Sequence, residues 1–539
     1  MRVFSYVPFG ASGIVIKVEV DVRRGIPGVD ITGLAEGAVR EARERVRAAF
    51  RNSDYRFPLD RVLINLAPAG LRKDGAALDL PIALAVMCAT GLAPQEEAVM
   101  VLGELELSGT VRPVRGVLAA VAAGIGEGIG DFIVPWENAG EAEVLVREHG
   151  SIRIAPVTTL REALHVLVVR SETGTLPVSA FSPEYSGGES VRGNRGLPAV
   201  WGDFSEVRGQ DRYKRALELA AAGGHNLLVF GPPGAGKTML ARRLPAIMAG
   251  LTSDEAVEVT RLHSLAGCFD RKSRESGDFS LITRPPFRSP HHSASAEGIL
   301  GGGRMVRPGE ISLAHLGVLF LDEAPEFRST VLQALREPLE DRVITISRAE
   351  SSIRLPAAFQ LIMAANACPC GRLGARGGDP SSGQVCLCSP EEVNRYWRRF
   401  GSALLDRIEL RVPVIPPGLG EITGRPGETS AVIAGRVIRA VEIQRDRLGA
   451  LPEQPCRNAR LPAGLVERYC PLSGRARQAL GIAVSRLALS GRAYHSILRL
   501  ARTIADLEGQ DSIDKVHVLE AVEHRRRGDD PYDILAEGC

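Results

Sequence analysis

The chain has 539 residues, of which 45% are hydrophobic and 24% are charged, and its formal net charge is +2. This length predicts about three or four domains, and the composition is ordinary for a soluble globular protein. The near-neutral charge excludes a protein that binds polyanions through its overall charge, so any DNA contact must come from local arginine clusters. No run of about 18 apolar residues occurs, and residues 1–10 lack the layout of a secretory signal. We therefore expect a cytoplasmic protein with no membrane partner.

Residues 1–170 alternate between strand and helix patterns. Period-two alternation predicts strands over 13–22, 28–33 and 61–67, and helical spacing predicts helices over 36–51 and 80–90. A hairpin is predicted over 99–114. This order predicts an independent α/β domain without a phosphate loop. Residues 171–199, rich in Ser, Gly, Glu and Pro without periodicity, predict a linker.

Two motifs, at residues 73–77 and 109–116, make this first domain resemble the Lon-protease-type domain, which is itself similar to part of ribosomal protein S5. In active Lon proteases the first motif holds a nucleophilic Ser, and a Lys follows the second. Here Ala77 and Leu118 occupy these positions. Without a nucleophile and an amine base the domain cannot catalyse acyl transfer. We therefore expect a scaffold or interaction domain without protease activity.

Residues 200–426 carry the pattern of an ATP-binding domain. The apolar run 227–230 predicts a buried strand, and the spacing of residues 239–248 predicts a helix. Between them lies a phosphate-binding loop: Gly231, Pro232, Pro233, Gly234, Ala235, Gly236, Lys237 and Thr238. The glycines let backbone N–H groups turn onto phosphates, Lys237 neutralises phosphate charge, and the Thr238 hydroxyl can ligate Mg²⁺. The loop predicts ATP and Mg²⁺ as cofactors.

A second apolar run, residues 318–321, ends in Asp322 and Glu323. After a buried strand, the first carboxylate can hold Mg²⁺ through water, and the second can activate the attacking water. An acidic pair alone would be interpreted as a solvated loop start. Together with the phosphate loop, the pair predicts an ATPase.

Residues 284–312 form an insertion that contains His291 and His292. No nearby Cys or HxxE spacing completes a metal site, so we expect a loop that closes a subunit interface or lines a pore. A helix over 330–340 and a hairpin over 342–355 then lead to a strand over 359–364, which ends near Asn366. An Asn at the end of such a strand can orient the lytic water, although in isolation it would be interpreted as a turn cap.

Two close pairs of cysteines occur in the Cys-rich loop 368–388: Cys368, Cys370, Cys386 and Cys388. Four thiolates can form a closed, structural tetrahedral Zn²⁺ site. CxC spacing is less diagnostic than CxxC, so free thiols remain an alternative. Disulfides are a third alternative, which a reducing cytosol disfavours.

Residues 427–539 have helical patterns over 431–448, 473–489, 496–507 and 513–526. They predict a helical lid whose closure couples the nucleotide state to movement. The expected fold is α/β, with an N-terminal domain that resembles the Lon-protease-type domain, a central P-loop domain that resembles an AAA+ module, and a C-terminal helical lid.

The run 284–323, with the later runs 365–371 and 404–409, resembles the magnesium-chelatase-like AAA+ ATPases of the YifB/ComM type. The resemblance covers nearly the whole chain. It implies a homohexameric ring that acts on single-stranded or branched DNA, with branch-migration or helicase activity in recombination during natural transformation. By motif, it implies that Asn366 is the sensor, Arg407 the finger that reaches a neighbour's γ-phosphate, and Arg499 the second sensor. Arg399 and Arg502 are the alternative candidates for these two arginine roles.

Four arginines are candidate DNA contacts: Arg304 and Arg307 in the insertion, and Arg342 and Arg348 in the hairpin. Contacts of this kind would be to phosphates and sensitive to salt, although these arginines could instead pair with nearby acids. Two other functions compete: a chelatase-type motor subunit that binds no DNA, and a protein-remodelling ATPase for which the first domain recruits substrates. The Lon-like domain and the cysteine pairs favour the DNA translocase.

Overall fold

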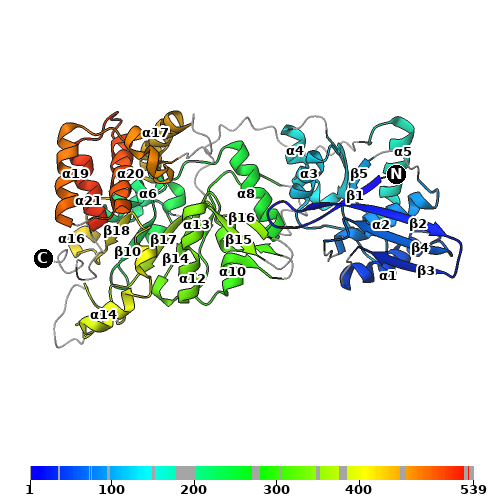
Figure 1. Cartoon of the computed structure of the whole chain (residues 1–539), viewed down its shortest axis with the longest axis horizontal. Coiled ribbons are helices and arrows are strands. Elements are labelled where there is room, and N and C mark those ends of the chain that lie inside the picture. The colour runs from blue at the N-terminus through cyan, green and yellow to red at the C-terminus, as the bar shows by residue number, and fades with distance from the viewer. Residues whose placement is uncertain are drawn as a thin grey trace.

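A computed structural model of the chain describes residues 2–33, 37–71, 73, 76–93, 98–148, 152–177, 202–269, 279–303, 306–347, 352–374, 385–449, 457–487, 489–526 and 532. The N-terminal domain, the ATP-binding domain and the C-terminal helices follow one another along the long axis of the molecule (Figure 1). Within the described residues, no helix is both long and apolar enough to cross a membrane.

The N-terminal domain is built on a seven-stranded sheet of order β3-β4-β2-β1-β5-β8-β9. Its strands are β1 (Arg2–Val7), β2 (Ile14–Arg23), β3 (Gly28–Thr32), β4 (Arg61–Ala67), β5 (Ala98–Val101), β8 (Asp131–Pro135) and β9 (Arg153–Val157). Its helices are α1 (Gly37–Asn52), α2 (Asp79–Ala89), α3 (Val117–Gly126), α4 (Ala139–Glu148) and α5 (Leu160–Thr173). The predicted α/β fold is confirmed. The hairpin is shorter than predicted: only β6 (Glu104–Leu105) and β7 (Val111–Arg112) pair, while β5 joins the large sheet.

The two Lon-type positions lie in apolar surroundings. Ala77, in the 3₁₀ turn η1 (Ala76–Leu78), packs against the same hydrophobic cluster that contains the buried Leu118 of α3. Lys73, from the same motif, is fully buried. Its ammonium donates hydrogen bonds to the carbonyl oxygens of Gly33 and Leu71, each at 2.8 Å, and to that of Pro68. Since its acceptors are neutral carbonyls, the role of this lysine here is to tie together the loop after β3 and the loop after β4.

The ATP-binding domain is built on a five-stranded sheet of order β11-β14-β17-β10-β18. All four pairings are parallel. The strands are β10 (Leu227–Phe230), β11 (Phe287–Arg288), β14 (Val318–Leu321), β17 (Gln360–Ala365) and β18 (Leu410–Pro413). Because the strands are parallel, every residue that follows a strand lies at one edge of the sheet, and every residue that precedes one lies at the opposite edge.

The remaining elements of this domain surround the sheet. They are α6 (Asp211–Gly223), α7 (Lys237–Ala241), α8 (Ser253–Ala266), α10 (Ala296–Leu300), β12 (Gly301–Gly302), β13 (Arg307–Pro308), α11 (Glu310–Leu313), α12 (Ser329–Ala334), α13 (Arg336–Asp341), β15 (Val343–Ser347), β16 (Ser352–Pro356), α14 (Pro390–Trp397), α15 (Ser402–Leu405) and α16 (Leu419–Ile422). The antiparallel pair β15–β16 confirms the second predicted hairpin.

Two predicted helices were too long, and proline explains both. The helix predicted over 239–248 ends at Ala241, four residues before Pro245. The helix predicted over 330–340 divides after Ala334, four residues before Pro338. A proline ring clashes with the carbonyl of the residue four positions earlier and removes one backbone donor, so each helix stops where this clash would begin.

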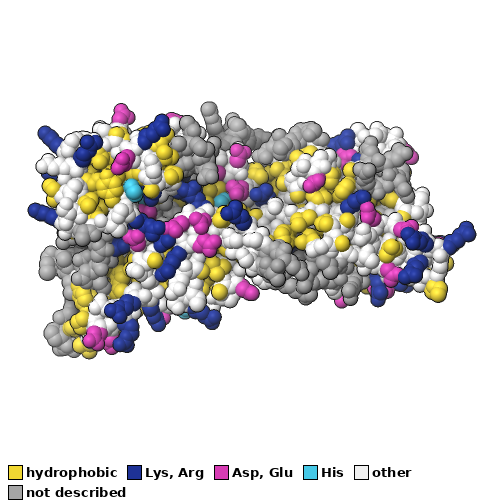
Figure 2. Space-filling view, in the orientation of Figure 1, with side chains coloured by type: hydrophobic (Ala, Val, Ile, Leu, Met, Phe, Trp, Pro, Cys, Tyr) yellow, Lys and Arg dark blue, Asp and Glu magenta, His cyan; other side chains and the backbone are white. Residues whose placement is uncertain are grey.

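The C-terminal region is helical, as predicted, with α17 (Ser430–Leu448), α18 (Ala463–Tyr469), α19 (Gly474–Leu487), α20 (Gly491–Leu507) and α21 (Lys515–Arg526). Its apolar side chains share one core cluster with α6, β10 and β18. The buried His225, just before β10, makes a 2.8 Å hydrogen bond to the hydroxyl of Thr503 in α20. On the face drawn in Figure 2, apolar side chains gather over these helices, where Ile482, Val516 and Leu519 are exposed.

Candidate ATPase site

The phosphate loop lies between β10 and α7, as the sequence predicts. Gly234 and Gly236 have φ values of +76° and +84°, a region that L side chains rarely adopt. A Cβ on Gly231 would come within 1.9 Å of the carbonyl oxygen of Val414 after β18. The glycines are therefore required by the turn itself and by its close approach to the neighbouring strand.

Lys237 opens α7 and is nearly buried, with 9% of its surface exposed. Its ammonium donates to the carbonyl oxygens of Gly231 at 2.7 Å and Pro232 at 2.9 Å, and to Oδ1 of Asn366 at 3.3 Å. Burial lowers the pKa of Lys237 to about 8, while the nearby Asp322 and Glu323 oppose the shift. A phosphate that enters the loop can replace these neutral acceptors with charged oxygens.

The predicted Mg²⁺ ligands are in contact. The hydroxyl of Thr238 donates to Oδ2 of Asp322, which follows β14, at 2.8 Å. Behind them, the buried hydroxyl of Tyr213 in α6 donates to the carbonyl oxygen of Lys237 at 2.9 Å. Oxygen ligands of this kind suit Mg²⁺, which is held in such sites by a hydroxyl, a carboxylate and the nucleotide phosphates.

Glu323 has a left-handed backbone with φ of +49°, and its side chain is 62% exposed. Oε2 of Glu323 lies 3.6 Å from Nδ1 of His292. The sequence predicts an interface or pore loop around His292 and does not connect this residue with Glu323. The two residues meet because β11 lies beside the parallel strand β14, so residues that follow either strand reach the same edge; the sequence alone did not show this strand order.

Asn366 follows β17, the strand between β10 and β14. Its amide oxygen meets the ammonium of Lys237, so the phosphate loop, the acidic pair and the sensor candidate come together at one edge of the sheet. Their side chains can bind a nucleotide with its metal, orient a water molecule and accept its proton.

Arg407 and Arg499 lie together at the opposite edge. They line a cavity of about 590 Å³ whose walls include Gly224, Asn226 and Ala358, all of which precede strands. Asn226 donates through Nδ2 to the carbonyl oxygen of Arg407 at 3.0 Å. Since β10 has 4 residues, at about 3.3 Å per residue the two edges are roughly 13 Å apart. Both arginines thus lie at the end of the sheet opposite the phosphate loop of their own chain.

The arginine cavity is only partly neutralised by acids. Arg407 pairs with Glu340 at 2.8 Å, and burial lowers the pKa of Arg499. Burial also raises the pKa of Glu409, a carboxyl beside Arg499. The Nε atoms of Arg407 and Arg499 are buried and have no hydrogen-bond partner among the described residues. Buried donors of this kind favour an anionic ligand.

The two alternative arginines lie elsewhere. Arg399 contacts Glu326 at 3.3 Å and the carbonyl oxygen of Pro325, close to the acidic pair of its own chain. Arg502 is fully buried and pairs with Asp506 at 3.0 Å within α20. Of the two, Arg399 remains exposed to solvent, whereas Arg502 serves the packing of the C-terminal helices.

The candidate DNA-contacting arginines also differ in their surroundings. Arg307 is exposed on β13, and Arg342 donates to the carbonyl oxygen of Arg460 at 2.9 Å in the wall of the arginine cavity. Arg342 therefore faces the C-terminal helices and is a poorer candidate for a DNA contact than the sequence suggested. Arg304 and Arg348 lie outside the described residues.

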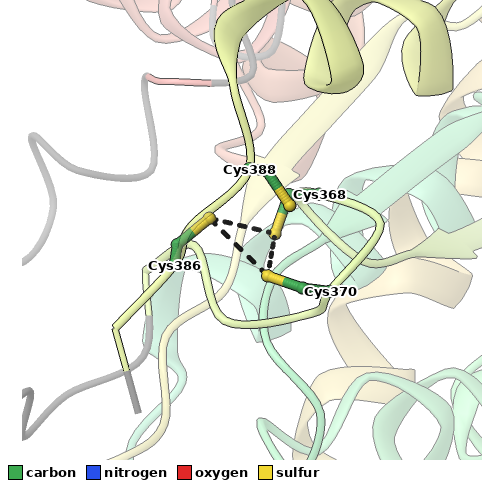
Figure 3. A group of neighbouring side chains, drawn as sticks. All are labelled: Cys368, Cys370, Cys386 and Cys388. Atoms are coloured by element: carbon green, nitrogen blue, oxygen red, sulfur yellow. Dashed lines mark hydrogen bonds between the residues drawn. The ribbon is translucent and has the colours of Figure 1, made fainter. Parts of the chain in front are cut away.

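The four cysteines of the Cys-rich loop converge, with their sulfur atoms all within 4.8 Å of one another (Figure 3). The Sγ atom of Cys368 lies 3.3 Å from that of Cys370, and the Sγ atom of Cys386 lies 3.6 Å from each of these two sulfurs. Four thiolates at about 2.3 Å from one Zn²⁺ would be roughly 3.8 Å apart, so the cluster has the size of a metal site. None of the described cysteines forms a disulfide.

Comparisons with known proteins cover nearly the whole chain. Family models match residues 203–420 (magnesium chelatase, subunit ChlI), residues 18–138 (subunit ChlI of Mg-chelatase) and residues 427–525 (the ChlI C-terminal part). Protein YifB of Salmonella typhimurium is 40% identical over 522 residues, which are 96% of this chain and 95% of YifB. Competence protein ComM of Haemophilus influenzae is 38% identical over 529 residues, 97% of each chain. Lon protease 2 of Bacillus subtilis is 26% identical over 191 residues, 32% of this chain and 33% of the protease.

Proposed function

The chain belongs to the YifB/ComM-type family of magnesium-chelatase-like AAA+ proteins, and from this premise we propose that it is an ATP-driven DNA translocase. It moves branched or joint DNA, as a helicase or branch-migration motor, during recombination in natural transformation. It works in the cytoplasm, where both ATP and DNA are present. The similarity to the competence protein ComM supports a role in transformation, and the geometry of the two sheet edges supports a motor.

The observation that carries the ATPase is the meeting of Lys237, Thr238 and Asp322 at one edge of a parallel sheet. Bound Mg²⁺ would neutralise charge on the nucleotide phosphates. Thr238 and Asp322 would hold that ion, and Lys237 would exchange its loop carbonyls for phosphate oxygens. Glu323 would then take the proton of the attacking water, which Asn366 orients.

A ring-shaped oligomer is supported by the position of Arg407 and Arg499 at the edge of the sheet opposite the phosphate loop. A cationic cavity that cannot reach its own nucleotide can complete the site of a neighbouring subunit, as an arginine finger and second sensor do. A closed ring follows when each subunit supplies this edge to the next, and we propose a homohexamer. The exposed apolar side chains on α19 and α21 support a further protein surface there.

We also propose that the four converging cysteines bind one structural Zn²⁺. The size of the cluster and the absence of an open ligand position support a closed Cys₄ site.

Hydrolysis of ATP by the purified protein, measured with and without single-stranded, duplex and four-way-junction DNA, tests the proposal. Glu323→Gln is the inactive control. We expect stimulation by at least one DNA, lost in Glu323→Gln and weakened by added salt. Hydrolysis that is indifferent to every DNA would overturn the translocase and favour a protein-remodelling or chelatase-type motor.

Mixed rings test the role of Arg407. An Arg407→Ala subunit keeps its own phosphate loop, and a Glu323→Gln subunit keeps its own Arg407, so neighbours of the two kinds form one complete site. We expect a mixture to hydrolyse ATP faster than either variant alone. Arg399→Ala mixed with Glu323→Gln is the matched control and should show no such gain. A mixture that only averages the two variants would contradict a finger that acts between subunits.

A further inference from the structure

The cysteine cluster begins immediately after the sensor candidate. Cys368 follows Asn366 by two residues, so whatever fixes the sulfur of Cys368 also restrains the end of β17. Gly371, at the turn between Cys370 and Leu373, has φ of +76°, and a Cβ on it would lie 3.1 Å from the ring of Pro233. The first half of the cluster therefore packs directly on the phosphate loop.

The second half of the cluster leads into α14. Cys386 and Cys388 precede Ser389, whose side chain caps α14 together with Glu392 in a capping box. From the last turn of α14, the indole N–H of Trp397 donates to the carbonyl oxygen of Ala367 at 3.0 Å. The hydroxyl of Tyr396 is hydrogen-bonded to the backbone of Asn366.

The helix also reaches both neighbouring strands of the site. The ring of Trp397 meets that of Phe230, the last residue of β10, edge-on at 5.1 Å between centroids. Arg399, just beyond α14, donates to the carbonyl oxygen of Pro325, close to the acidic pair. The four sulfurs thus join the chain segment that carries Asn366 to the segment that leads into α14.

We propose that Zn²⁺ in this cluster is a positioning element of ATP hydrolysis: by joining the two segments it holds Asn366 at the phosphate loop. The inference rests on the proposed ATPase function. On binding, the thiols release their protons to solvent, and the four sulfurs become the closed ligand shell of the ion. Without the ion, the cluster would lose its cross-link while the strand β17 and the helix α14 remain, so the carboxamide of Asn366 would lose its fixed position before the domain loses its fold.

A structural metal that only supported the fold would change stability and nothing else. A positioning metal changes kcat for ATP hydrolysis while leaving KM for ATP nearly unchanged, because the phosphate loop itself stays intact. These two roles are separated by kinetics on protein that is still folded.

The first experiment measures metal content by mass spectrometry in the purified full-length protein. We expect one zinc per chain in the wild type, none in Cys370→Ser/Cys386→Ser, and a retained zinc in Cys386→His and in the matched control Cys268→Ser, whose cysteine lies outside the cluster. A wild-type protein that takes up no zinc, even after incubation with Zn²⁺, would overturn the proposal.

The second experiment removes zinc from the wild type with a chelator and adds it back. We expect kcat to fall about tenfold with KM changed by less than about twofold, and full recovery with Zn²⁺ but not with Mg²⁺. Cys386→His should keep most of the wild-type kcat. Unchanged kcat in folded, zinc-free protein would overturn the positioning role.

A readout independent of hydrolysis separates this proposal from the proposed function. Chelation should change the fluorescence of Trp397, measured as the difference from Trp397→Phe, and Zn²⁺ should restore it. If the protein hydrolyses no ATP but Trp397 responds to zinc, the ATPase proposal fails while the metal link to the Asn366 segment stands. If hydrolysis proceeds and Trp397 does not respond to zinc, the link is wrong.

Discussion

The first two domains each contain a buried lysine that follows a loop and is held by backbone carbonyls. Lys73 in the N-terminal domain is fully buried, Lys237 in the ATP-binding domain is 9% exposed, and burial lowers the pKa of both. Judged by burial and pKa direction alone, the two would appear to be equally good candidates for a catalytic group.

Their partners separate them. Lys73 donates to two carbonyls of its own loop and to that of Gly33 in a second loop, which uses all three of its donor hydrogens, and none of these acceptors is a carboxylate. Lys237 donates to two carbonyls of its own loop and to Asn366, with Asp322 and Glu323 nearby. A buried lysine is thus poised for chemistry when its partners can be exchanged for a ligand, and structural when they belong to the fold.

Replacing Lys237 gives the largest expected effect. We expect Lys237→Ala to lower ATP hydrolysis at least about 100-fold, because one preorganised cation facing the phosphates is lost. The melting temperature should stay within a few degrees of the wild type. Steady-state ATPase assays and thermal melts measure both. If Lys73→Ala lowered kcat as strongly, the distinction between the two lysines would be wrong.

The reverse holds for Lys73. Lys73→Ala leaves three partly buried carbonyls without this donor, which costs about 2–3 kcal/mol of unfolding free energy. Urea unfolding and limited proteolysis of the N-terminal domain should detect the loss. Lys17→Ala, which removes a lysine whose side chain is 42% exposed, is the matched control and should change stability by less than about 0.5 kcal/mol.

His225 is a third buried side chain that can carry a positive charge, and its protonation makes the stability of the protein depend on pH. Burial lowers the pKa of His225, at the contact with α20, to about 3. The folded protein therefore keeps this histidine neutral, whereas the unfolded chain binds a proton below about pH 6.5. The contribution of neutral His225 to the unfolding free energy is complete above pH 6.5, and it falls by about 1.4 kcal/mol for each pH unit below that value.

We accordingly expect the unfolding free energy to drop by about 1.4 kcal/mol more between pH 7.5 and 5.5 in the wild type than in His225→Gln, which stays neutral at both values. Denaturant unfolding at the two pH values measures the difference. Equal acid sensitivity in both proteins would show that His225 is solvated before unfolding.

The sequence predicted those features that a short stretch of residues is enough to identify. The phosphate loop, the acidic pair, the two hairpins and the four cysteines could be located because glycines, carboxylates and thiols at fixed spacings have few other uses. Helix length was less predictable, since helical spacing ran through Pro245 and Pro338 without a break, whereas the backbone helix ends at Ala241 in one case and divides after Ala334 in the other.

The relations that were missed all depend on strand order. The sequence did not show that β11 lies beside β14, which brings His292 to Glu323, nor that Arg407 and Arg499 share one cavity at the far edge. The same holds for Lys73, which ties together the loops that follow the neighbouring parallel strands β3 and β4. Order in a parallel sheet is set by long-range packing, which no local pattern encodes.

The smallest expected effect concerns His292. Its side chain is 37% exposed and that of Glu323 is 62% exposed, so the pair is weakened by solvent and can only orient the carboxylate. We expect His292→Ala to lower kcat about threefold, against a loss of at least about 100-fold in Glu323→Gln. His291→Ala is the control, because His291 pairs with Ser293 at 2.8 Å, and it should leave kcat within about 1.5-fold. A loss in His292→Ala as deep as that in Glu323→Gln would mean that the histidine takes part in the proton transfer itself, and the acidic edge would then contain two groups that handle the proton, where the sequence predicted one.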